Sequence, residues 1–161
     1  METSLKADVQ QRMNEEWSAL GAALAGLSEP RMLEGGVVGA WSIKDLLGHI
    51  AFWAQQAASN TELVKAGRQD QIARPGSSKD IDRWNAREQR LRADRPLAEV
   101  SRELEESHEL ALAALAGLPE EKLGLDLEGG TFLELYAVDT YDHYREHTDQ
   151  VLAWRKRRVD T

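Results

Sequence analysis

The chain contains no cysteine. This absence excludes disulfide bonds, thiolate catalysis and sulfur-ligated metals, so any bound metal must use nitrogen and oxygen ligands. Long apolar runs are also missing: the longest, Leu110–Ala116, is far shorter than the roughly 20 residues that a membrane-spanning helix needs. The segment Met1–Lys6 lacks the basic and apolar regions of a signal peptide. We therefore expect a cytoplasmic protein with no membrane partner.

Positive charge is scarce as well. The sequence holds 20 Lys and Arg against 28 Asp and Glu, which gives a formal net charge of -8. Because phosphate binding needs a cationic surface, this balance predicts that nucleic acid is not a partner. The chain has 161 residues, of which 42% are hydrophobic. Both values are typical of one globular domain that spans residues 1–161 and buries a sizeable core.

The apolar residues recur at steps of three and four, which predicts an all-α fold. Ser42 and Thr131 are each followed three residues later by an acid, so both are expected to open helices with capping boxes. The segments Ala23–Glu29 and Ala114–Glu120 resemble each other, and each precedes a Gly-Gly pair and a capping box. This echo indicates two αα-hairpins, although residues this common could also repeat by chance. Two hairpins joined by a long crossover that contains a short extra helix predict a four-helix bundle. The expected long helices cover 3–27, 43–66, 96–117 and 131–158, the crossover covers 68–95, and its short helix covers 81–92.

Three of the four histidines form a candidate metal site. His143 and His147 are four residues apart, so they project from one face of a helix and can clamp one divalent ion. They continue a seam at helical spacing that runs from Tyr136 to Trp154 and faces the bundle interior. His49 borders the apolar stripe of an earlier helix and could supply a third ligand. The alternative is three core histidines that are satisfied by hydrogen bonds, but each desolvated ring would then need its own partner.

Other residues near the histidines have plainer interpretations. His108 is surrounded by acids and is predicted to lie on a solvated helix face. Asp45 is expected to serve the helix cap, whereas Asp139 could either hold the far ring nitrogen of a ligand or have no such role. Trp53 and Trp84 could each line a substrate pocket, and for Trp53 packing in the bundle is the favoured role. For Trp84, packing and lining a substrate pocket are equally open.

These motifs resemble those of the DinB/YfiT-like superfamily. The resemblance covers nearly the whole chain and rests on Trp41-Ser42-x-x-Asp45-x-x-x-His49-x-x-x-Trp53, followed far downstream by His143-x-x-x-His147. It implies a four-helix bundle, often dimeric, in which His49, His143 and His147 bind zinc, nickel or another divalent ion. The stretches around Trp84–Asn85 and Tyr141–His147 are also similar to the ClbS-like branch.

The resemblance implies several activities. Members of the superfamily transfer low-molecular-weight thiols, carry out mycothiol-dependent isomerisation, or hydrolyse a cyclopropane to protect against a genotoxin; the last reaction need not use the three-His metal. A divalent ion held by three neutral imidazoles would activate either a water or a thiol cofactor. We therefore expect a metal-dependent hydrolase or thiol S-transferase that acts on a small molecule, in a homodimer. A non-catalytic binding or sequestering protein and a metal-stabilised structural bundle are the alternatives. Arg145 and Arg83 are the arginines near the motifs that could meet an anionic thiol.

Overall fold

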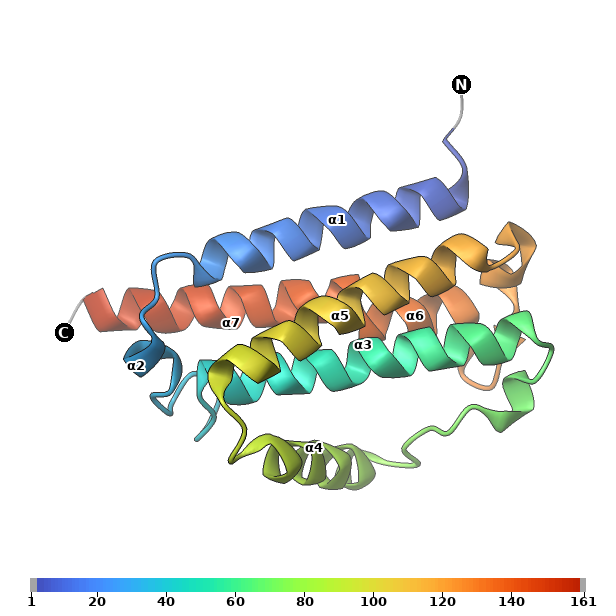
Figure 1. Ribbon diagram of the computed structural model, residues 1–161. Helices are drawn as coiled ribbons and strands as arrows, with labels where there is room; N and C mark the ends of the chain where they lie inside the picture. Colours follow the sequence, from blue (N-terminus) through green and yellow to red (C-terminus); the bar gives the residue numbers. More distant parts are fainter. Residues whose placement is uncertain (1–2, 160–161) are drawn as a thin grey trace.

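The computed structural model describes residues 3–159 and is almost entirely helical (Figure 1). Four long helical stretches form the body of the molecule, and the last of them is divided in two. Short helices, turns and one small hairpin connect these stretches. The elements in chain order are α1 (Leu5–Leu24), α2 (Glu29–Met32), α3 (Ile43–Lys65), the 3-10 turn η1 (Gln69–Gln71), α4 (Ser78–Arg92), α5 (Leu97–Gly117), the 3-10 turn η2 (Glu120–Gly124), β1 (Asp126–Leu127), β2 (Gly130–Thr131), α6 (Phe132–Asp139) and α7 (Tyr141–Val159).

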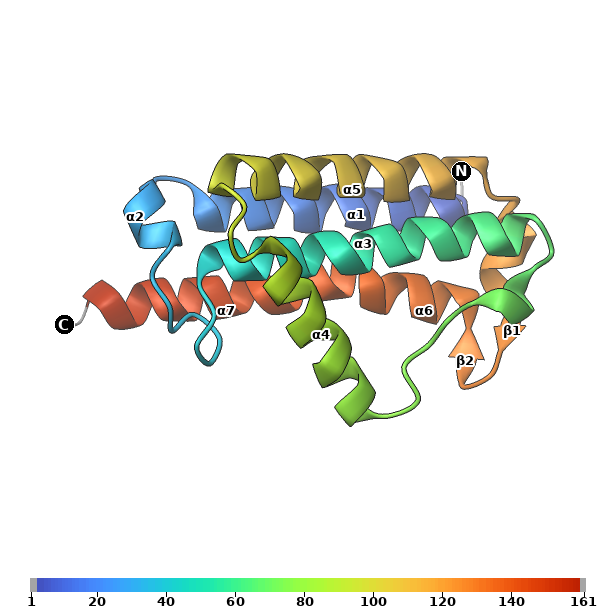
Figure 2. The same ribbon diagram turned by 60° about the horizontal axis from the view of Figure 1, so that its bottom comes forward.

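The long helices pack as a four-helix bundle with one long crossover, which confirms the predicted fold class. Helices α3 and α5 run in one direction, and α1 and the α6–α7 pair run in the other (Figure 1). The most extensive packing joins α3 to α5 and α1 to α7. Because α3 and α5 are parallel, the chain between them must return along the bundle, and α4 lies on that return path (Figure 2). Within residues 3–159, no helix is long and apolar enough to cross a membrane.

The helix ends follow from local chemistry. The Ser42 hydroxyl accepts a hydrogen bond from the Asp45 backbone N–H, and the Asp45 carboxylate accepts one from the Ser42 backbone N–H. Thr131 and Glu134 form the same reciprocal pair at the start of α6. These two capping boxes confirm the predicted helix starts, and the Ser42 box also confirms the expected role of Asp45. At the other end of α3, Gly67 adopts a φ of 72°, a backbone conformation that glycine reaches without steric cost.

The predicted final helix over 131–158 is wrong in one respect, because it is interrupted at Thr140. The Thr140 hydroxyl donates to the Tyr136 carbonyl at 2.6 Å, and the Thr140 backbone N–H turns to the Ala137 carbonyl at 3.2 Å. The side chain thus takes the acceptor that a continuous helix would reserve for the backbone. Helix α7 then begins anew, with the Tyr144 N–H donating to the Thr140 carbonyl.

The crossover is anchored to the bundle through the second half of α4. The Arg92 guanidinium donates to the Glu88 carboxylate at 2.8 Å and to the Glu103 carboxylate of α5 at 2.6 Å. Its aliphatic part lies over Gly48, where an added Cβ would meet Arg92 Cδ at 2.6 Å. The Gln89 amide donates to Asp45 at 3.1 Å, which ties α4 to the start of α3. These contacts fix the crossover against α3 on the side where His49 lies.

His108 lies inside the bundle, so its predicted position on a solvated face is wrong. It is 4% exposed, and its ring stacks on Trp17 with centroids 4.1 Å apart. Its Nδ1 shares a 3.1 Å hydrogen bond with the Tyr144 hydroxyl. The acidic neighbours in the sequence concealed a second pattern: His108 continues the buried steps of Leu104 and Ala111 along α5. Helical phase was therefore a better guide than local charge.

Burial of His108 predicts a pH-dependent stability. Desolvation lowers the pKa of His108 from 6.5 to about 4, so the unfolded chain takes up this proton at higher pH than the folded chain does. The stabilisation is complete above about pH 6.5 and is lost as the pH falls toward 4. Between about pH 4 and 6.5, we expect the wild-type protein to take up roughly one more proton on unfolding than the His108→Phe variant does. The phenyl ring of this variant keeps the stack on Trp17. Urea unfolding between pH 4.5 and 7 measures this difference. Equal pH slopes for the two proteins would contradict it.

Candidate metal centre

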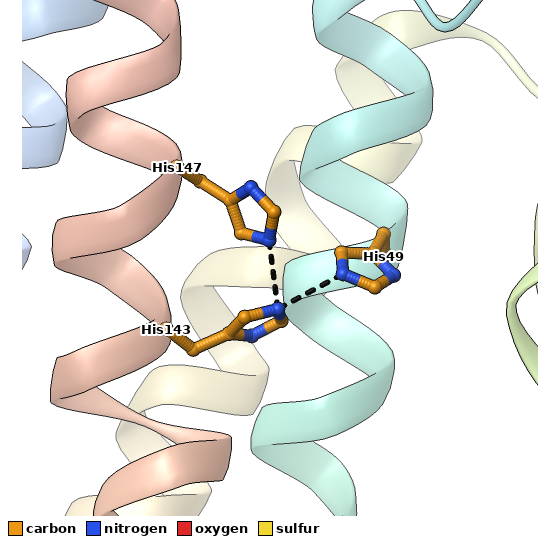
Figure 3. Close-up of side chains that lie close together, drawn as sticks. All are labelled: His49, His143 and His147. Carbon is orange, nitrogen blue, oxygen red and sulfur yellow. Dashed lines mark hydrogen bonds between the residues drawn. The ribbon is translucent and has the colours of Figure 1, made fainter. Parts of the chain in front are cut away.

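Three histidines from two helices converge at one point inside the bundle. His49 comes from α3, whereas His143 and His147 come from successive turns of α7 (Figure 3). The Nε2 atom of His143 lies 2.9 Å from Nε2 of His49 and 2.7 Å from Nε2 of His147. Within residues 3–159, this is the group of His, Asp and Glu side chains that could hold a metal ion, with ligand atoms within 4.8 Å of one another. The structure therefore brings together the three residues that the sequence singled out.

The three rings are held in their neutral form. Burial, together with the charge that His147 can carry, lowers the pKa of His49 to about 3. Burial also places the pKa of His143 well below 6.5, again with help from its two neighbours. The pKa of His147 is lowered by burial as well. Neutral imidazoles keep a free lone pair near neutral pH, which is the form that binds metal ions.

The hydrogen bonds of the cluster fit a bound cation better than an empty cluster. His147 Nδ1 lies 2.6 Å from the Gln150 side-chain oxygen, an acceptor, so its proton resides on Nδ1 and its Nε2 carries a lone pair. If His143 Nε2 carries a proton, it can donate that proton to His147 Nε2. His143 then has no lone pair on Nε2 to offer to His49 Nε2, which lies 2.9 Å away. Within residues 3–159, Nδ1 of His49 and Nδ1 of His143 are buried without a hydrogen-bond partner. A cation held by the three Nε2 atoms would remove the conflict at His143 Nε2, because each Nε2 could then offer its lone pair to the ion, while Nδ1 of His49 and of His143 would keep their protons.

The cluster opens into a cleft of about 410 Å³ between α3, the α6–α7 break and the crossover. All three histidines line it, so one side of the cluster faces the space where a substrate would bind. Residues from four segments complete the walls. They are Trp53, Gln56 and Asn60 of α3; Ala73, Arg74 and Pro75 before α4; Ile81 and Asn85 of α4; and Leu135, Val138, Asp139 and Glu146 of α6 and α7.

The tryptophans beside the cluster divide between lining and packing. Trp53 lines the cleft, and its indole N–H donates to the Asn85 side chain at 2.9 Å. Trp84 stacks on Trp53 with centroids 6.0 Å apart and is not part of the cleft wall. Of the two open roles for Trp84, the structure therefore favours packing. Trp41 makes an edge contact with the His49 ring, with centroids 5.1 Å apart.

The structure also decides which polar neighbours support the ligands. Asp139 lies in the cleft wall, but His143 Nδ1 has no hydrogen-bond partner within the described chain, so Asp139 does not hold that ring. Gln150 instead orients His147, a role that sequence reasoning missed. The available signal was its spacing, because Gln150 follows His147 by three residues on the same helix face.

The arginines expected near the site are engaged elsewhere. Arg145 donates to Glu16 of α1 at 2.9 Å, and Arg83 pairs with Asp80 within α4. The arginine that does line the cleft is Arg74, whose guanidinium donates to the Glu128 carbonyl at 2.5 Å. Its position depends on the path of the crossover between η1 and α4, which residue spacing does not specify.

Comparisons with known proteins agree with this architecture. The sequence model of the DinB superfamily matches residues 12–151. A solved structure of the colibactin self-resistance protein ClbS in complex with double-stranded DNA is 15% identical, with a TM-score of 0.82, and the alignment covers 97% of this chain and 98% of that chain. The structure of the sibling lethal factor precursor DfsB is 13% identical, with a TM-score of 0.80 and coverage of 98% of both chains. No curated protein matches the sequence. At these identities the structural likeness establishes the fold alone.

The expectation that nucleic acid is excluded is wrong. ClbS, which shares this fold, was crystallised with double-stranded DNA. The physical reason is that net charge is a sum over the whole surface, whereas phosphate contacts are local. Residues 68–95 hold eight Lys and Arg against five Asp and Glu, a net of +3, while the rest of the chain carries -11. The overall charge of -8 therefore conceals a cationic crossover.

Proposed function

Because this chain belongs to the DinB superfamily, we propose that it is a metal-dependent enzyme that acts on a small molecule. In this proposal His49, His143 and His147 hold one divalent ion, zinc or nickel, at the inner end of the cleft. The observation that carries it is the convergence of three neutral imidazoles on one point with one side open to the cleft. Three protein ligands beside an open position are typical of catalytic metal sites, whereas structural sites are closed.

The side chains around the cluster supply the rest of the site. When bound, a divalent ion contributes Lewis-acid activation of a nucleophile, either a water or a low-molecular-weight thiol. Gln150 fixes the tautomer of His147 and so keeps its Nε2 lone pair aimed at the centre. Trp41 packs edge-on against the His49 ring, and Trp53 lines the cleft into which the histidines open. Leu135 and Val138 offer apolar surface on which a substrate can rest.

Two reaction classes follow, and turnover assays separate them from mere binding. We expect zinc- or nickel-loaded protein to hydrolyse 4-nitrophenyl acetate, or to transfer a thiol such as cysteine to 1-chloro-2,4-dinitrobenzene. The rate should fall by roughly 10²-fold or more in His49→Ala, because metal and nucleophile activation are lost together. Absorbance of the released nitrophenolate or of the thioether product measures the two reactions. Thermal stabilisation by ligands without turnover of either substrate would instead favour a non-catalytic sequestering protein.

A second candidate function, binding of double-stranded DNA, is favoured by one surface. Lys79, Arg83, Arg87 and Arg90 are exposed on α4. Their steps of four, four and three place them on one face of the helix. The two ribbon views both place α4 outside the bundle (Figures 1 and 2). The four side chains are therefore accessible to a partner, and the ion pairs of Arg83 with Asp80 and of Arg87 with Glu88 lie within α4. The DNA-bound structure of ClbS, with the same fold, supports this choice of polyanion.

The salt dependence of DNA binding tests this second function. Contacts with about four phosphates give a slope of roughly -3.6 in log affinity against log salt. We expect replacement of the four basic residues of α4 by glutamine to remove most of that slope. Fluorescence anisotropy of a labelled duplex at 50 to 200 mM salt measures it.

A charge-matched variant provides the control for this experiment. It replaces four exposed cations elsewhere on the molecule with glutamine, namely Lys65, Arg102, Lys156 and Arg157. The slope should be retained in this control if α4 carries the contacts. Equal losses in the two variants would mean that binding follows net charge and has no defined surface.

A further inference from the structure

One polar side chain beside the histidines has its orientation fixed by a single contact. Asn85 of α4 lines the cleft, and its side-chain oxygen accepts a 2.9 Å hydrogen bond from the indole N–H of Trp53. An indole nitrogen can only donate, so the end of the Asn85 amide that faces it must be the oxygen. A flipped amide would set one N–H group against another. Trp53 therefore determines which end of the Asn85 amide remains for other partners.

The same side chain lies beside the metal-ligand cluster. Burial lowers the pKa of the His49 ring, and a hydrogen-bonding interaction with the Asn85 side chain opposes that decrease. A group that favours the protonated ring acts as an acceptor, so the Asn85 oxygen is the atom near this ring. The contact falls short of a full hydrogen bond, because Nδ1 of His49 has no such partner within residues 3–159. The carbonyl end of Asn85 is thus beside both Trp53 and His49, which are one helical turn apart on α3.

The nitrogen end of the Asn85 amide is left to the cleft. Within residues 3–159, no hydrogen bond uses this nitrogen. The side chain is half-buried and belongs to the cleft wall, so its two N–H groups are the polar groups that it can offer to a ligand there. Because Trp53 sets their direction before a ligand arrives, binding through them costs little side-chain freedom. Gln56 brings a second amide to the wall, but no hydrogen bond within the described chain fixes its orientation.

We propose that Asn85 is a specificity-determining residue, which donates from its amide nitrogen to a carbonyl oxygen of the substrate and so selects carbonyl compounds for reaction beside the histidines. A carbonyl oxygen accepts hydrogen bonds and has no hydrogen of its own to place, whereas an ammonium group can only donate. Trp53 holds the donor in position, and α4 carries it to the site. This inference rests on the proposed function, of which it names the substrate class.

A matched pair of probes isolates the contribution of the carbonyl oxygen. The ketone is 4-hydroxyacetophenone, and the alkene is 4-isopropenylphenol, which has the same shape with a CH2 group in place of the oxygen. NMR titration of metal-incubated protein gives the ratio of the alkene Kd to the ketone Kd. We expect this ratio to fall about tenfold in Asn85→Asp and in Asn85→Leu. The aspartate variant keeps an acceptor for Trp53 and lacks the N–H donors, so it separates donation to the ligand from support of the cleft.

Three further variants test the orientation of the donor. Trp53→Phe removes the bond that holds the amide and should lower the ratio several-fold, whereas Trp84→Phe alters the ring stacked on Trp53 and should preserve the ratio. Gln56→Leu removes the unfixed amide and should have a smaller effect than Asn85→Leu.

The contrary outcomes are equally defined. An unchanged ratio in both Asn85 variants or in Trp53→Phe, or an equal loss in Gln56→Leu, would overturn the inference. Metal content, measured on the same samples, separates the two proposals. Ketone selectivity that depends on Asn85 but occurs without bound metal overturns only the enzyme, and bound metal without such selectivity overturns only the substrate class.

Discussion

Replacing His143 with alanine is expected to reduce the bound divalent metal from about one ion per chain to none. His143 is the central ligand, because its Nε2 lies within 2.9 Å of Nε2 in both other histidines. Two residual imidazoles on different helices would form a weak site. Elemental analysis of tag-free protein after incubation with zinc and nickel measures the change. In the wild type, metal at 100 times its Kd should stabilise the fold by about 2.7 kcal/mol, and chelation should remove that gain.

The fourth histidine and Gln150 provide graded controls for the metal experiment. His108→Phe removes a buried histidine that is stacked on Trp17 and lies outside the cluster, so it should keep a full complement of metal. Gln150→Leu leaves all three ligands but frees the ring of His147, and it should weaken metal affinity by about 10- to 100-fold. Retention of metal in His143→Ala, or no metal in the wild type after incubation, would contradict the site and identify the three rings as core histidines.

The sequence predicted the features that local chemistry controls. The capping boxes at Ser42 and Thr131 confirm that a reciprocal hydrogen-bond pair is readable from a four-residue spacing. The resemblance to the DinB/YfiT-like superfamily is also confirmed, and with it the four-helix bundle. The convergence of the histidines followed from the i, i+4 pair together with a stripe on another helix. Their metal remains a prediction, because geometry supplies the ligands and not the ion.

What could not be predicted depends on contacts between distant segments. The break at Thr140 arises because a buried threonine side chain captures a backbone carbonyl, which the apolar pattern does not reveal. The crossover contributes the polar side chains of Arg74 and Asn85 to the cleft, and the positions of both depend on where the crossover settles. That placement is fixed by a network between α4 and α5, whose members look like ordinary surface charges in the sequence.

Arg92 is the centre of that network and is the second residue whose loss should have a large effect. Its side chain is 10% exposed, and those of Glu88 and Glu103 are 11% and 16% exposed. Burial alone would raise the pKa of Glu103, but hydrogen bonds from Arg92, Gln55 and Arg95 outweigh it and hold that pKa below its usual range. The carboxylates thus depend on their cations. The contribution of Glu103 to stability is present near neutral pH and is lost as the pH falls through its lowered pKa.

Arg92→Leu should therefore lower the free energy of unfolding by about 3 kcal/mol, because it leaves two largely buried carboxylates short of a partner. Arg102→Leu is the matched control: its ion pair with Glu106 is exposed and 4.0 Å long, so its loss should cost less than about 1 kcal/mol. Urea unfolding at pH 7 measures both.

Adding Glu88→Leu and Glu103→Leu to Arg92→Leu should recover much of the loss, since an apolar cluster can replace a buried ion network. A small effect of Arg92→Leu would mean that Arg95, which pairs with Glu103 at 2.6 Å, is sufficient to hold α4. A large effect would mean that this network holds the crossover wall of the cleft in position. It would then also hold Asn85 against Trp53, beside the histidines.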